Sequence, residues 1–518
     1  MLDIVFLALL LWLLSFYTGG KINPQITHEL HPVLTNPVLA IGIFFILFSL
    51  KNWLAYRLLI FQHHFFYNVA SRLSKKNLLY YLRNNYLQFI HVDSSVRIRQ
   101  ISQQPVEFSH YILNNLQQIA TQSLLIFFTV CAILFYHPLL FLLLLIFLLP
   151  PVVVLGMVIR KRSKQIRAQT QTASQKTIQY LQESLAGYIE SNIYDKSDFF
   201  TDRYQQYQHE LNNNLATQQT LVSLPTRLIE IFAILGIFVL AVVSKYSSGN
   251  AAPDLFTIGV FMAAAYKIIP GMVKILNSAG QIRTYEPTLT DLLGFEETIA
   301  AAKTNETINC IKFDGISFKY EQEPVLNDLS FELKSGDMAG LWGRSGSGKS
   351  TVVHLMMGFL SSQKGNILIN NNLNQKLYLQ RISYVKQQPY FIHDTLVNNI
   401  TLGDGTYNVH KMNDIITFCG LDTLLQTYPE GLNTIITENG KNISGGQRQR
   451  IMLARALYHD FDVLVLDEPF SEMDEPAESS ILKQIQLLAA QGKIIILITH
   501  NQTSLAWCNK VINLDEQN

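Results

Sequence analysis

The chain has 518 residues, of which 48% are hydrophobic and 15% are charged. This length exceeds what a single hydrophobic core holds, and the apolar composition excludes an ordinary soluble protein, so we expect a membrane domain beside a soluble one. The 40 lysines and arginines nearly balance the 39 aspartates and glutamates, which gives no reason to expect a nucleic-acid partner. Four cysteines without CxxC spacing predict neither a zinc site nor a disulfide framework.

The long hydrophobic runs of the chain lie before residue 280. Each is long enough, or nearly long enough, to cross a bilayer as a helix. We predict six spans, at roughly 3–17, 37–59, 116–136, 139–159, 224–243 and 255–275. The first span is short, and a cleaved signal peptide is its alternative, although the run lacks the basic start and the small-residue cleavage site of such peptides. Six spans leave both ends of the chain on the same side of the membrane.

Lysine and arginine concentrate in the segment between the second and third predicted spans and in the segment between the fourth and fifth. The positive-inside rule places both segments in the cytoplasm. We expect them to be helical, because residues 160–219 contain no proline and only Gly187. At 1.5 Å per residue, such helices would extend well beyond the bilayer and reach a soluble domain.

The composition changes near residues 288–305, after which short strand-like and helix-like segments alternate. We therefore predict a transmembrane domain at 1–290, a linker at 291–305 and a soluble domain at 306–518. Alternating strands and helices are typical of a parallel sheet covered by helices. The expected fold class is an α-helical six-span transmembrane domain with long cytoplasmic helices, followed by an α/β domain.

The soluble domain contains a complete phosphate-binding loop, GRSGSGKST, at residues 343–351. Its glycines let backbone N–H groups turn towards one anion, Lys349 reaches the outer phosphates, and the Ser350 hydroxyl can hold Mg2+. Before the loop, residues 338–342 predict a buried strand, and after it residues 351–357 predict a helix whose positive end points at the phosphates. We expect a nucleoside triphosphate to contact Gly343, Ser345, Gly346, Ser347, Gly348, Lys349, Ser350 and Thr351.

A second apolar strand, predicted at 462–466, is followed by Asp467 and Glu468. We assign Mg2+ binding through water to Asp467, and to Glu468 the orientation or deprotonation of the attacking water. A solvated acidic strand end is the alternative. A third strand, predicted at 494–498, is followed by His500, which either hydrogen-bonds the transferred phosphate or has only a structural role.

Residues 442–450, NISGGQRQR, precede a strongly helical run at 451–457. Ser444, Gly445, Gly446 and Gln447 therefore form the start of a helix, where backbone N–H groups lack partners within the helix. Such a helix end attracts anions. One chain thus carries two predicted phosphate-binding helix ends.

The order and spacing of these motifs resemble the ABC transporter superfamily over nearly the whole chain. Residues 343–351 match its Walker A motif and residues 463–468 its Walker B motif. Residues 443–447 match its LSGGQ signature, with isoleucine for leucine. The resemblance implies that the soluble domain is a P-loop ABC ATPase domain with a helical subdomain.

Four further positions extend the resemblance. Gln387 matches the Q-loop of the family, His500 its switch histidine, and Tyr320 the aromatic residue that stacks on adenine. Residues 471–474, SEMD, match the D-loop, although glutamate and methionine replace the usual small residue and leucine. We expect no counterpart of the amphipathic elbow that often precedes the first span of the family.

The resemblance narrows to exporters, because the membrane and ATPase parts are fused in that order and residues 434–440 look like the exporter-specific loop before the signature. In such exporters the Walker A motif of one subunit and the signature of the other enclose ATP. The resemblance therefore implies a second copy of this chain as partner, with a heterodimer as the alternative. It also implies contacts to the ATPase domain from turns near residues 93–99 and 193–199, in grooves beside Gln387.

The resemblance implies roles for individual residues. Lys349, Gln387, Glu468 and His500 would be catalytic. ATP would also contact Tyr320, Gln387, Asp467 and the signature residues Ser444, Gly445, Gly446 and Gln447. The cofactor Mg2+ would be held by Ser350, Gln387 and Asp467.

Two lysines within a predicted span, Lys267 and Lys274, are the residues from which we infer the class of transported molecule. They lie two helical turns apart in the sixth predicted span, on nearly one face. Facing a cavity, they would bind an anionic headgroup; near the end of the span, they would instead extend to the lipid headgroups. Residues 265–270 and 281–289 resemble the exporter subgroup that contains lipid-linked oligosaccharide flippases.

We therefore predict an ATP-driven flippase for an amphiphilic, anionic lipid or lipid-linked glycan. Its expected place is the bacterial inner (plasma) membrane, with the ATPase domain in the cytoplasm. An exporter of hydrophobic drugs or peptides is the first alternative. An ATP-gated channel or regulator is the second, and it would be expected to have a degenerate catalytic site.

Overall fold

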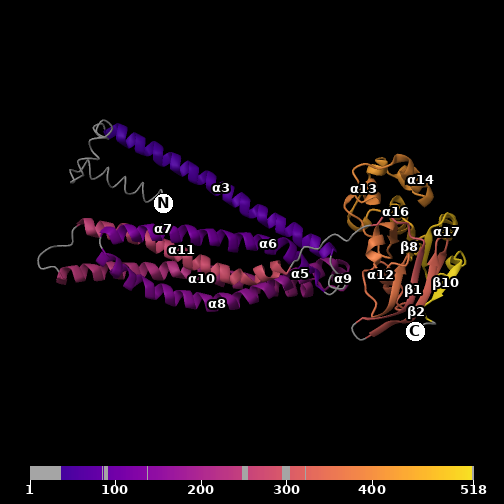
Figure 1. Cartoon of the computed structure of the whole chain (residues 1–518), viewed down its shortest axis with the longest axis horizontal. Coiled ribbons are helices and arrows are strands. Elements are labelled where there is room, and N and C mark those ends of the chain that lie inside the picture. The colour runs from indigo at the N-terminus through magenta and orange to yellow at the C-terminus, as the bar shows by residue number, and fades with distance from the viewer. Residues whose placement is uncertain are drawn as a thin grey trace. The chain divides into compact units, whose positions relative to one another are not determined.

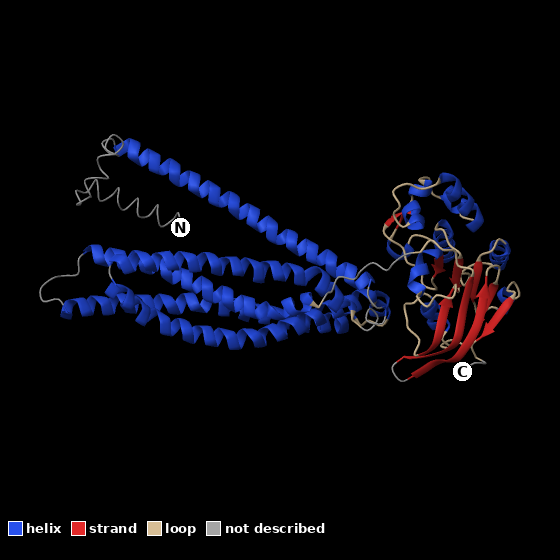
Figure 2. Ribbon diagram, viewed as in Figure 1, coloured by secondary structure: helices blue, strands red, loops and turns tan. Residues whose placement is uncertain are grey.

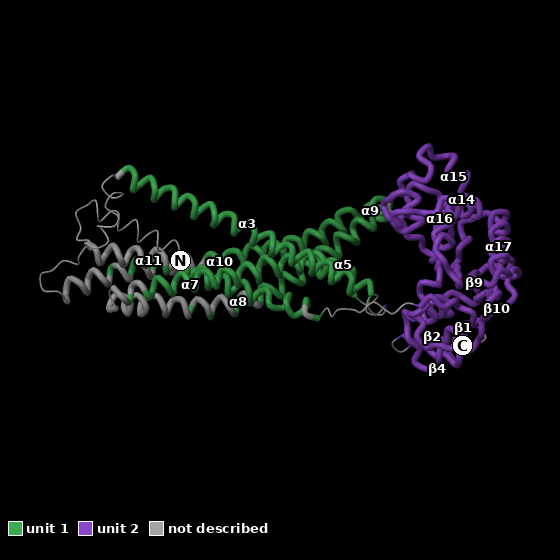
Figure 3. Tube along the Cα trace, turned by 45° about the horizontal axis from the view of Figure 1, so that its top comes forward, with its two compact units in different colours: residues 1–84, 91–298 green, residues 85–90, 299–518 purple. Residues whose placement is uncertain are grey.

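The computed structural model describes residues 37–83, 86, 92–136, 138–247, 255–294, 304–320 and 323–515; within them, the side chains of most residues in 132–164, 222–247 and 255–269 are not described. The chain forms two compact units (Figure 1), one helical and one that mixes strands with helices (Figure 2). Unit 1 comprises residues 1–84 and 91–298, and unit 2 comprises residues 85–90 and 299–518 (Figure 3).

Unit 1 consists of long helices, four of which (α7, α8, α10 and α11) lie side by side as a bundle (Figure 1). Helix α8 begins in a run of leucines, passes through Pro150 and Pro151, and continues into a polar stretch. The helices are α3 (Pro37–Arg83), α5 (Ser94–Ile98), α6 (Gln104–Glu107), α7 (Asn114–Tyr136), α8 (Pro138–Ala186), α9 (Tyr188–Ile193), α10 (Ser197–Ser247) and α11 (Leu255–Leu293), with π-helical turns at Arg99–Gln103 and Phe108–Leu113.

Five of the predicted spans fall inside these helices. The second lies in α3, and the next four lie in α7, α8, α10 and α11. In the part of the chain that the structure describes, one segment, Val38–Arg83, is long and apolar enough by composition to cross a membrane. The first predicted span, 3–17, lies outside the described residues, so the count of six stays a prediction.

The expected helix over residues 160–219 is confirmed except at Gly187 and at residues 194–196. Helix α8 ends at Ala186, α9 is short, and α10 begins at Ser197. A Cβ atom on Gly187 would lie 3.1 Å from the Glu183 carbonyl oxygen and 3.1 Å from Phe200 Cζ. Glycine therefore allows the chain to turn against the start of α10, where the sequence pattern alone suggested continuous helix.

A buried ionic cluster joins three segments of unit 1. Glu107 Oε2 lies 2.7 Å from Arg167 Nη2 on α8 and 3.5 Å from Arg99 Nη2. Both arginine side chains are at most 4% exposed, and burial lowers the pKa of Arg99. The Arg167 guanidinium also lies 4.1 Å from the ring centroid of Tyr285 on α11, which stacks on Tyr111. The cluster therefore fixes α8 and α11 against the segment before α7.

Unit 2 contains two main sheets, drawn in red in Figure 2. The antiparallel sheet has the order β2-β1-β4, and the parallel sheet has the order β10-β3-β9-β8-β5. The strands are β1 (Cys310–Tyr320), β2 (Glu323–Lys334), β3 (Met338–Trp342), β4 (Lys364–Ile369), β5 (Ile382–Val385), β8 (Val463–Asp467), β9 (Ile494–Ile498) and β10 (Lys510–Asn513), with a short pair formed by β6 (Asp394–Thr395) and β7 (Ile435–Ile436).

Helices cover the parallel sheet and form a group between β5 and β8 in the sequence. They are α12 (Lys349–Met356), α13 (Leu396–Thr401), α14 (Val409–Cys419), α15 (Asp422–Thr427), α16 (Gly445–Tyr458), α17 (Glu475–Ala490) and α18 (Gln502–Leu505). The predicted strands at 338–342 and 494–498 are confirmed, and the strand predicted at 462–466 is found one residue later.

Alternation along β8 divides unit 2 into two hydrophobic cores. Leu464 and Leu466 pack with α14, α16 and α17, whereas Val463 and Val465 pack with α12 and the antiparallel sheet. Side chains of a strand alternate between its two faces. Because both faces of the sheet are covered, the central strands are continuous apolar runs. Such runs could be recognised as strands in the sequence.

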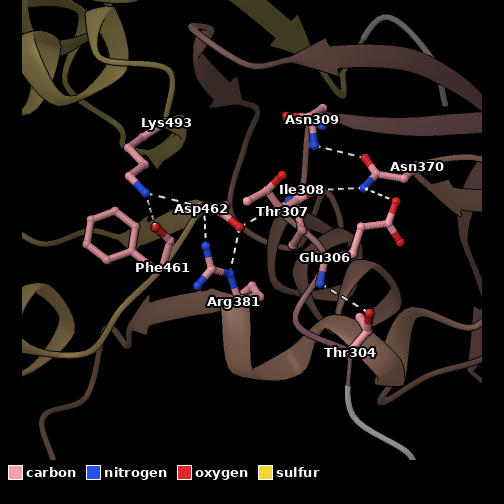
Figure 4. A network of polar contacts seen from close by, with 10 residues as sticks. All are labelled: Thr304, Glu306, Thr307, Ile308, Asn309, Asn370, Arg381, Phe461, Asp462 and Lys493. Atoms are coloured by element: carbon pink, nitrogen blue, oxygen red, sulfur yellow. Dashed lines mark hydrogen bonds and ion pairs between the residues drawn. The ribbon is translucent and has the colours of Figure 1, made fainter.

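Asp462, at the start of β8, connects the two sheets (Figure 4). Its carboxylate accepts hydrogen bonds from Arg381 Nε at 2.7 Å, from the Ile308 N–H at 3.0 Å and from Lys493 Nζ at 3.3 Å. Burial would raise the pKa of Asp462, but these hydrogen bonds outweigh it and lower the pKa. The network holds the segment before β1 against the parallel sheet. It lies at the amino-terminal ends of the parallel strands.

Candidate active site

The phosphate-binding loop joins the end of β3 to the start of α12. Gly348 is the N-cap of α12 with a φ of 94°, in the left-handed region that favours glycine. A Cβ atom there would lie 2.8 Å from Val325 Cγ1 and 3.0 Å from Leu326 Cδ2 on β2. Glycine therefore lets the loop pass against β2. The space beside Gly346 is open.

Lys349 lies buried beneath this loop. Its Nζ donates hydrogen bonds to the Gly343 carbonyl at 2.8 Å and to the Arg344 carbonyl at 2.7 Å. Burial lowers the pKa of Lys349, and nearby carboxylates act in the opposite direction. The Ser347 hydroxyl is buried without a hydrogen-bond partner in the described part of unit 2. A buried ammonium and an unpaired hydroxyl in a glycine-rich loop fit a bound polyphosphate.

Asp515, which follows β10, also holds the loop. Both of its carboxylate oxygens accept from the Arg344 N–H, at 3.0 and 3.1 Å. Strand β10 pairs in parallel with β3, which brings Asp515 beside the loop. The sequence analysis did not identify Asp515, because no motif marks it and its place depends on the pairing of distant strands.

Gln387, Glu468 and His500, all predicted to be catalytic, meet at the carboxyl ends of three adjacent strands. They follow β5, β8 and β9, which pair in parallel in that order. Gln387 Nε2 donates to Glu468 Oε2 at 2.6 Å, and His500 Nε2 lies 2.7 Å from Glu468 Oε1. The Glu468 backbone has a φ of 48°, an unusual conformation for a residue other than glycine. The carboxylate is therefore fixed from both sides.

Asp467 lies next to this group and is buried. Its Oδ2 accepts a hydrogen bond from the Tyr384 hydroxyl at 3.1 Å. Burial raises the pKa of Asp467, and the Tyr384 hydrogen bond and the Lys349 charge act in the opposite direction. Tyr384 lies on β5, paired with Val465 of β8. Sequence reasoning missed Tyr384, although its place three residues before Gln387 was a signal.

The donor set near Asp467 fits Mg2+. A carboxylate oxygen, a hydroxyl and an amide oxygen are ligands that this ion accepts, with water completing its shell. Asp467 supplies the carboxylate, while Ser350, on the first turn of α12, and Gln387 are both exposed. These residues would hold the ion. Their assignment as ligands remains a prediction.

The signature residues begin helix α16, as the sequence predicted. Ser444 is the N-cap and forms a capping box, in which the Ser444 N–H donates to Gln447 Oε1 at 2.9 Å and the Gln447 N–H donates to Ser444 Oγ at 3.4 Å. Within residues 304–320 and 323–515, no hydrogen bond or ion pair joins this helix end to the phosphate-binding loop. The structure therefore presents the two predicted anion sites as separate features of one unit.

Two tyrosines of unit 2 pack against other aromatic rings. Tyr320 ends β1, is half-buried and packs edge-on against Phe318 at 4.9 Å between ring centroids. Tyr86 packs against His354 of α12 at 4.8 Å and against Phe359 at 5.6 Å. Tyr86 was not identified from the sequence. The segments that were predicted to contact the ATPase domain, 93–99 and 193–199, belong to unit 1, and that prediction stays open.

The predicted substrate residues lie on α11. Lys267 lies within this helix but its side chain is not described, whereas Lys274 is exposed. Pro270 lies between them, inside the helix. Their role in binding a substrate stays a prediction.

Comparison with known proteins identifies both parts of the chain. Residues 112–266 match the family model described as the ABC transporter transmembrane region, and residues 326–471 match the model described as ABC transporter. The second match includes the phosphate-binding loop, the signature residues, Asp467 and Glu468.

Curated relatives and a solved structure agree with these matches. A probable ABC transporter ATP-binding/permease protein of Haemophilus influenzae is 33% identical over 44% of this chain and 41% of its own length. ATP-dependent lipid A-core flippase 2 of Colwellia psychrerythraea is 30% identical over 60% of this chain and 56% of its own length. The chain therefore matches about half the length of these relatives.

The fold resembles that of a bacterial Atm1-family ABC exporter solved with ATP bound. The TM-score is 0.79 at 18% identity, over 97% of this chain and 88% of that one. Identity this low supports only the fold: a helical transmembrane domain joined to an α/β ATPase domain. The two family models therefore show that the chain joins an ABC transporter transmembrane region, at residues 112–266, to an ABC transporter domain, at residues 326–471.

Proposed function

We propose that this chain hydrolyses ATP with Mg2+ and uses the energy to move an amphiphilic, anionic lipid or lipid-linked glycan across the bacterial inner membrane. The observation that carries the proposal is the Glu468 carboxylate, held between Gln387 and His500 beside the phosphate-binding loop. A general base must be held in position near the bond that breaks. The chain contains every residue that was predicted to be catalytic, which argues against the alternative of a non-transporting channel or regulator.

Each residue has a defined task in this proposal. Lys349 would exchange its carbonyl partners for the outer phosphates of ATP, which neutralise its buried charge. Glu468 would accept a proton from, or orient, the attacking water, and His500 would donate a hydrogen bond to the transferred phosphate. Asp467, Ser350 and Gln387 would hold Mg2+, which neutralises phosphate charge when bound.

The proposed assembly is a dimer of two copies of this chain. The signature helix and the phosphate-binding loop each offer an anion site, and within the described part of unit 2 no polar contact joins them. The signature of the second copy would lie against the ATP held by the first copy, and the signature of the first against the ATP held by the second. One interface would then close both sites. This reciprocity is what a twofold axis produces.

The transported molecule is proposed from charge and from one relative. Lys267 and Lys274 supply two cations on α11, a helix that includes a predicted span. Charges in such a helix mark substrate pathways more often than they serve stability. The flippase of Colwellia psychrerythraea is named for lipid A-core, which supports an anionic amphiphile as the class of substrate here.

ATPase measurements on the purified full chain in liposomes test the proposal. We expect hydrolysis that requires Mg2+ and disappears in Lys349→Ala. Lipid pyrophosphate-linked sugars, anionic glycerophospholipids, peptides and cationic dyes are then compared as stimulants. An anionic lipid should stimulate the wild type, whereas stimulation by peptides or dyes alone would establish the drug or peptide exporter.

The lysine variants separate binding from turnover. Lys267→Ala and Lys274→Ala should abolish stimulation by the lipid while leaving unstimulated hydrolysis unchanged. Arg283→Ala, an exposed cation on the same helix beyond the predicted span, is the matched control and should keep both. Full stimulation in both lysine variants would remove these residues from the substrate site.

A further inference from the structure

Glu472 occupies the D-loop position where the sequence departs from the family pattern, and its side chain lies on the signature helix. A Cβ atom built on Gly445 would lie 1.3 Å from Glu472 Oε2 and 2.5 Å from its Cδ. A Cβ atom on Gly446 would lie 3.0 Å from the Glu472 carbonyl oxygen. Both the carboxylate and the backbone of Glu472 are therefore packed against the first residues of α16.

The contact is held by two neighbouring residues of α16. Gln449, which is 7% exposed, accepts from the Glu472 N–H at 3.0 Å and donates to Ser471 Oγ at 2.6 Å. Arg448 Nη2 lies 3.4 Å from Glu472 Oε2. The backbone of the loop is thus fixed by a buried glutamine, and the carboxylate is directed towards the helix end by an arginine.

The Glu472 carboxylate lies beside the helix end that the proposed function assigns to a phosphate. The first N–H groups of a helix lack partners within it, and they give that end about half a positive charge. Helix α16 has 14 residues, and its first two are glycines without side chains to cover the backbone. The Glu472 carboxylate lies beside Gly445, and the Glu472 carbonyl oxygen lies beside Gly446.

We propose that Glu472 lowers the affinity of the signature half of the site for ATP, because its carboxylate competes with the phosphate of the nucleotide bound to the partner copy. This inference rests on the function proposed above. The Glu472 side chain is 48% exposed, so it can move aside into water when nucleotide arrives. The contact therefore tunes the ATP concentration at which two copies close and does not block closure.

The direction of the effect follows from charge alone. Removing the carboxylate relieves repulsion between two anions at one helix end and leaves Arg448 free to face the phosphate. A single charge at a helix end shifts an equilibrium by roughly two- to tenfold. We expect the ATP concentration for half-maximal hydrolysis to fall by about three- to tenfold in Glu472→Gln.

The experiment uses the full chain in liposomes and compares Glu472→Gln and Glu472→Ala with the wild type. Glu475→Gln is the matched control, because Glu475 is an exposed carboxylate three residues further on, in the first turn of α17. Half-maximal ATP concentrations are measured at low and high salt. We expect the shift in both Glu472 variants, none in the control, and a smaller shift at high salt.

A second measurement does not depend on turnover. In the Glu468→Gln background, ATP-dependent closure of two copies is followed by cross-linking, and adding Glu472→Gln should reduce the ATP needed for closure by a similar factor. Unchanged or higher ATP requirements in both measurements would overturn the inference. If the wild type itself shows no hydrolysis dependent on Mg2+, the proposed function fails; if it hydrolyses ATP and only the Glu472 shift is missing, the inference alone fails.

Discussion

Glu468 Oε1 lies 2.7 Å from His500 Nε2, while Gln387 donates to the other oxygen of the same carboxylate. Gln387 and His500 follow the strands β5 and β9, which neighbour β8 in the parallel sheet. The order of the strands therefore brings both residues to the Glu468 carboxylate. Under the proposed function, this carboxylate would act on a water molecule at the terminal phosphate of ATP.

The first prediction concerns Glu468→Gln. An amide of the same shape preserves the contacts but cannot accept a proton, so we expect hydrolysis to fall by at least about a hundredfold, a typical contribution of a general base. Nucleotide binding, measured with a fluorescent ATP analogue, should be retained. Near-normal hydrolysis would show that another group activates the water. Glu475→Gln provides the control for loss of a nearby charge.

The second prediction concerns Tyr384→Phe. The change removes the hydrogen bond to Asp467 Oδ2 and leaves the ring in place, so the carboxylate loses one of its restraints. We expect the Mg2+ concentration needed for tight nucleotide binding to rise by about tenfold, the lower end of the effect of losing a group that orients a metal ligand. Binding measured without Mg2+ should not change.

The control for this variant is Tyr378→Phe. The Tyr378 hydroxyl donates a hydrogen bond to Glu306 Oε2 at 2.9 Å. Glu306 lies before β1, away from the carboxyl ends of the strands that form the site. The same chemical change there should leave the Mg2+ titration as in the wild type. Equal shifts in both variants would indicate a general loss of stability and not a local effect on Asp467.

The third prediction concerns stability and pH at Asp462. Asp462→Asn should lower the free energy of unfolding by about 2 kcal/mol at neutral pH, because it weakens hydrogen bonds between charged groups. Folding lowers the pKa of Asp462, so its stabilisation is present above the ordinary value of about 4 and is lost as the pH falls through the lower folded-state value. The difference from the wild type should be constant from pH 5 to 8 and should shrink in stronger acid.

Asp460→Asn is the control for that measurement. Its ion pair with Lys411 has the same 2.7 Å distance as the pair between Arg381 and Asp462, but Asp460 is 84% exposed. A surface pair of this kind contributes less than about 1 kcal/mol. Thermal unfolding of the detergent-solubilised chain compares the two variants, and equal losses would contradict the importance of burial.

The fourth prediction concerns Glu107→Gln in unit 1. The change removes the carboxylate that two buried arginines share, which we expect to lower stability by about 3 kcal/mol. Glu183→Gln is the matched control, since Glu183 pairs with Arg203 at 3.4 Å with both side chains 40% exposed. The thermal midpoint of the solubilised chain should fall clearly in the first variant and little in the second.

The sequence predicted the parts of the site that depend on local pattern. The strands before the phosphate-binding loop, before Asp467 and before His500 are apolar runs because both faces of the sheet are covered. The loop itself is recognisable because its glycines and Lys349 have fixed spacing. The start of α16 was likewise readable from Ser444 and the two glycines.

Other features depend on strand order and could not be read from the chain. The meeting of Gln387, Glu468 and His500 requires β5, β8 and β9 to be neighbours, although long segments separate them in sequence. Asp515 reaches the loop only because β10 pairs with β3. Glu472 was visible as a departure from the family pattern, but its contact with Gly445 results from how the D-loop packs on α16.

The backbone of Glu468 has one more consequence. A left-handed conformation at a residue with a side chain costs about 1–3 kcal/mol, and glycine would adopt the φ of 48° without that penalty. Glu468→Gly should therefore make the fold more robust while removing the proton acceptor. Under the proposed function, the strained backbone at Glu468 is a stability cost that accompanies the proton acceptor.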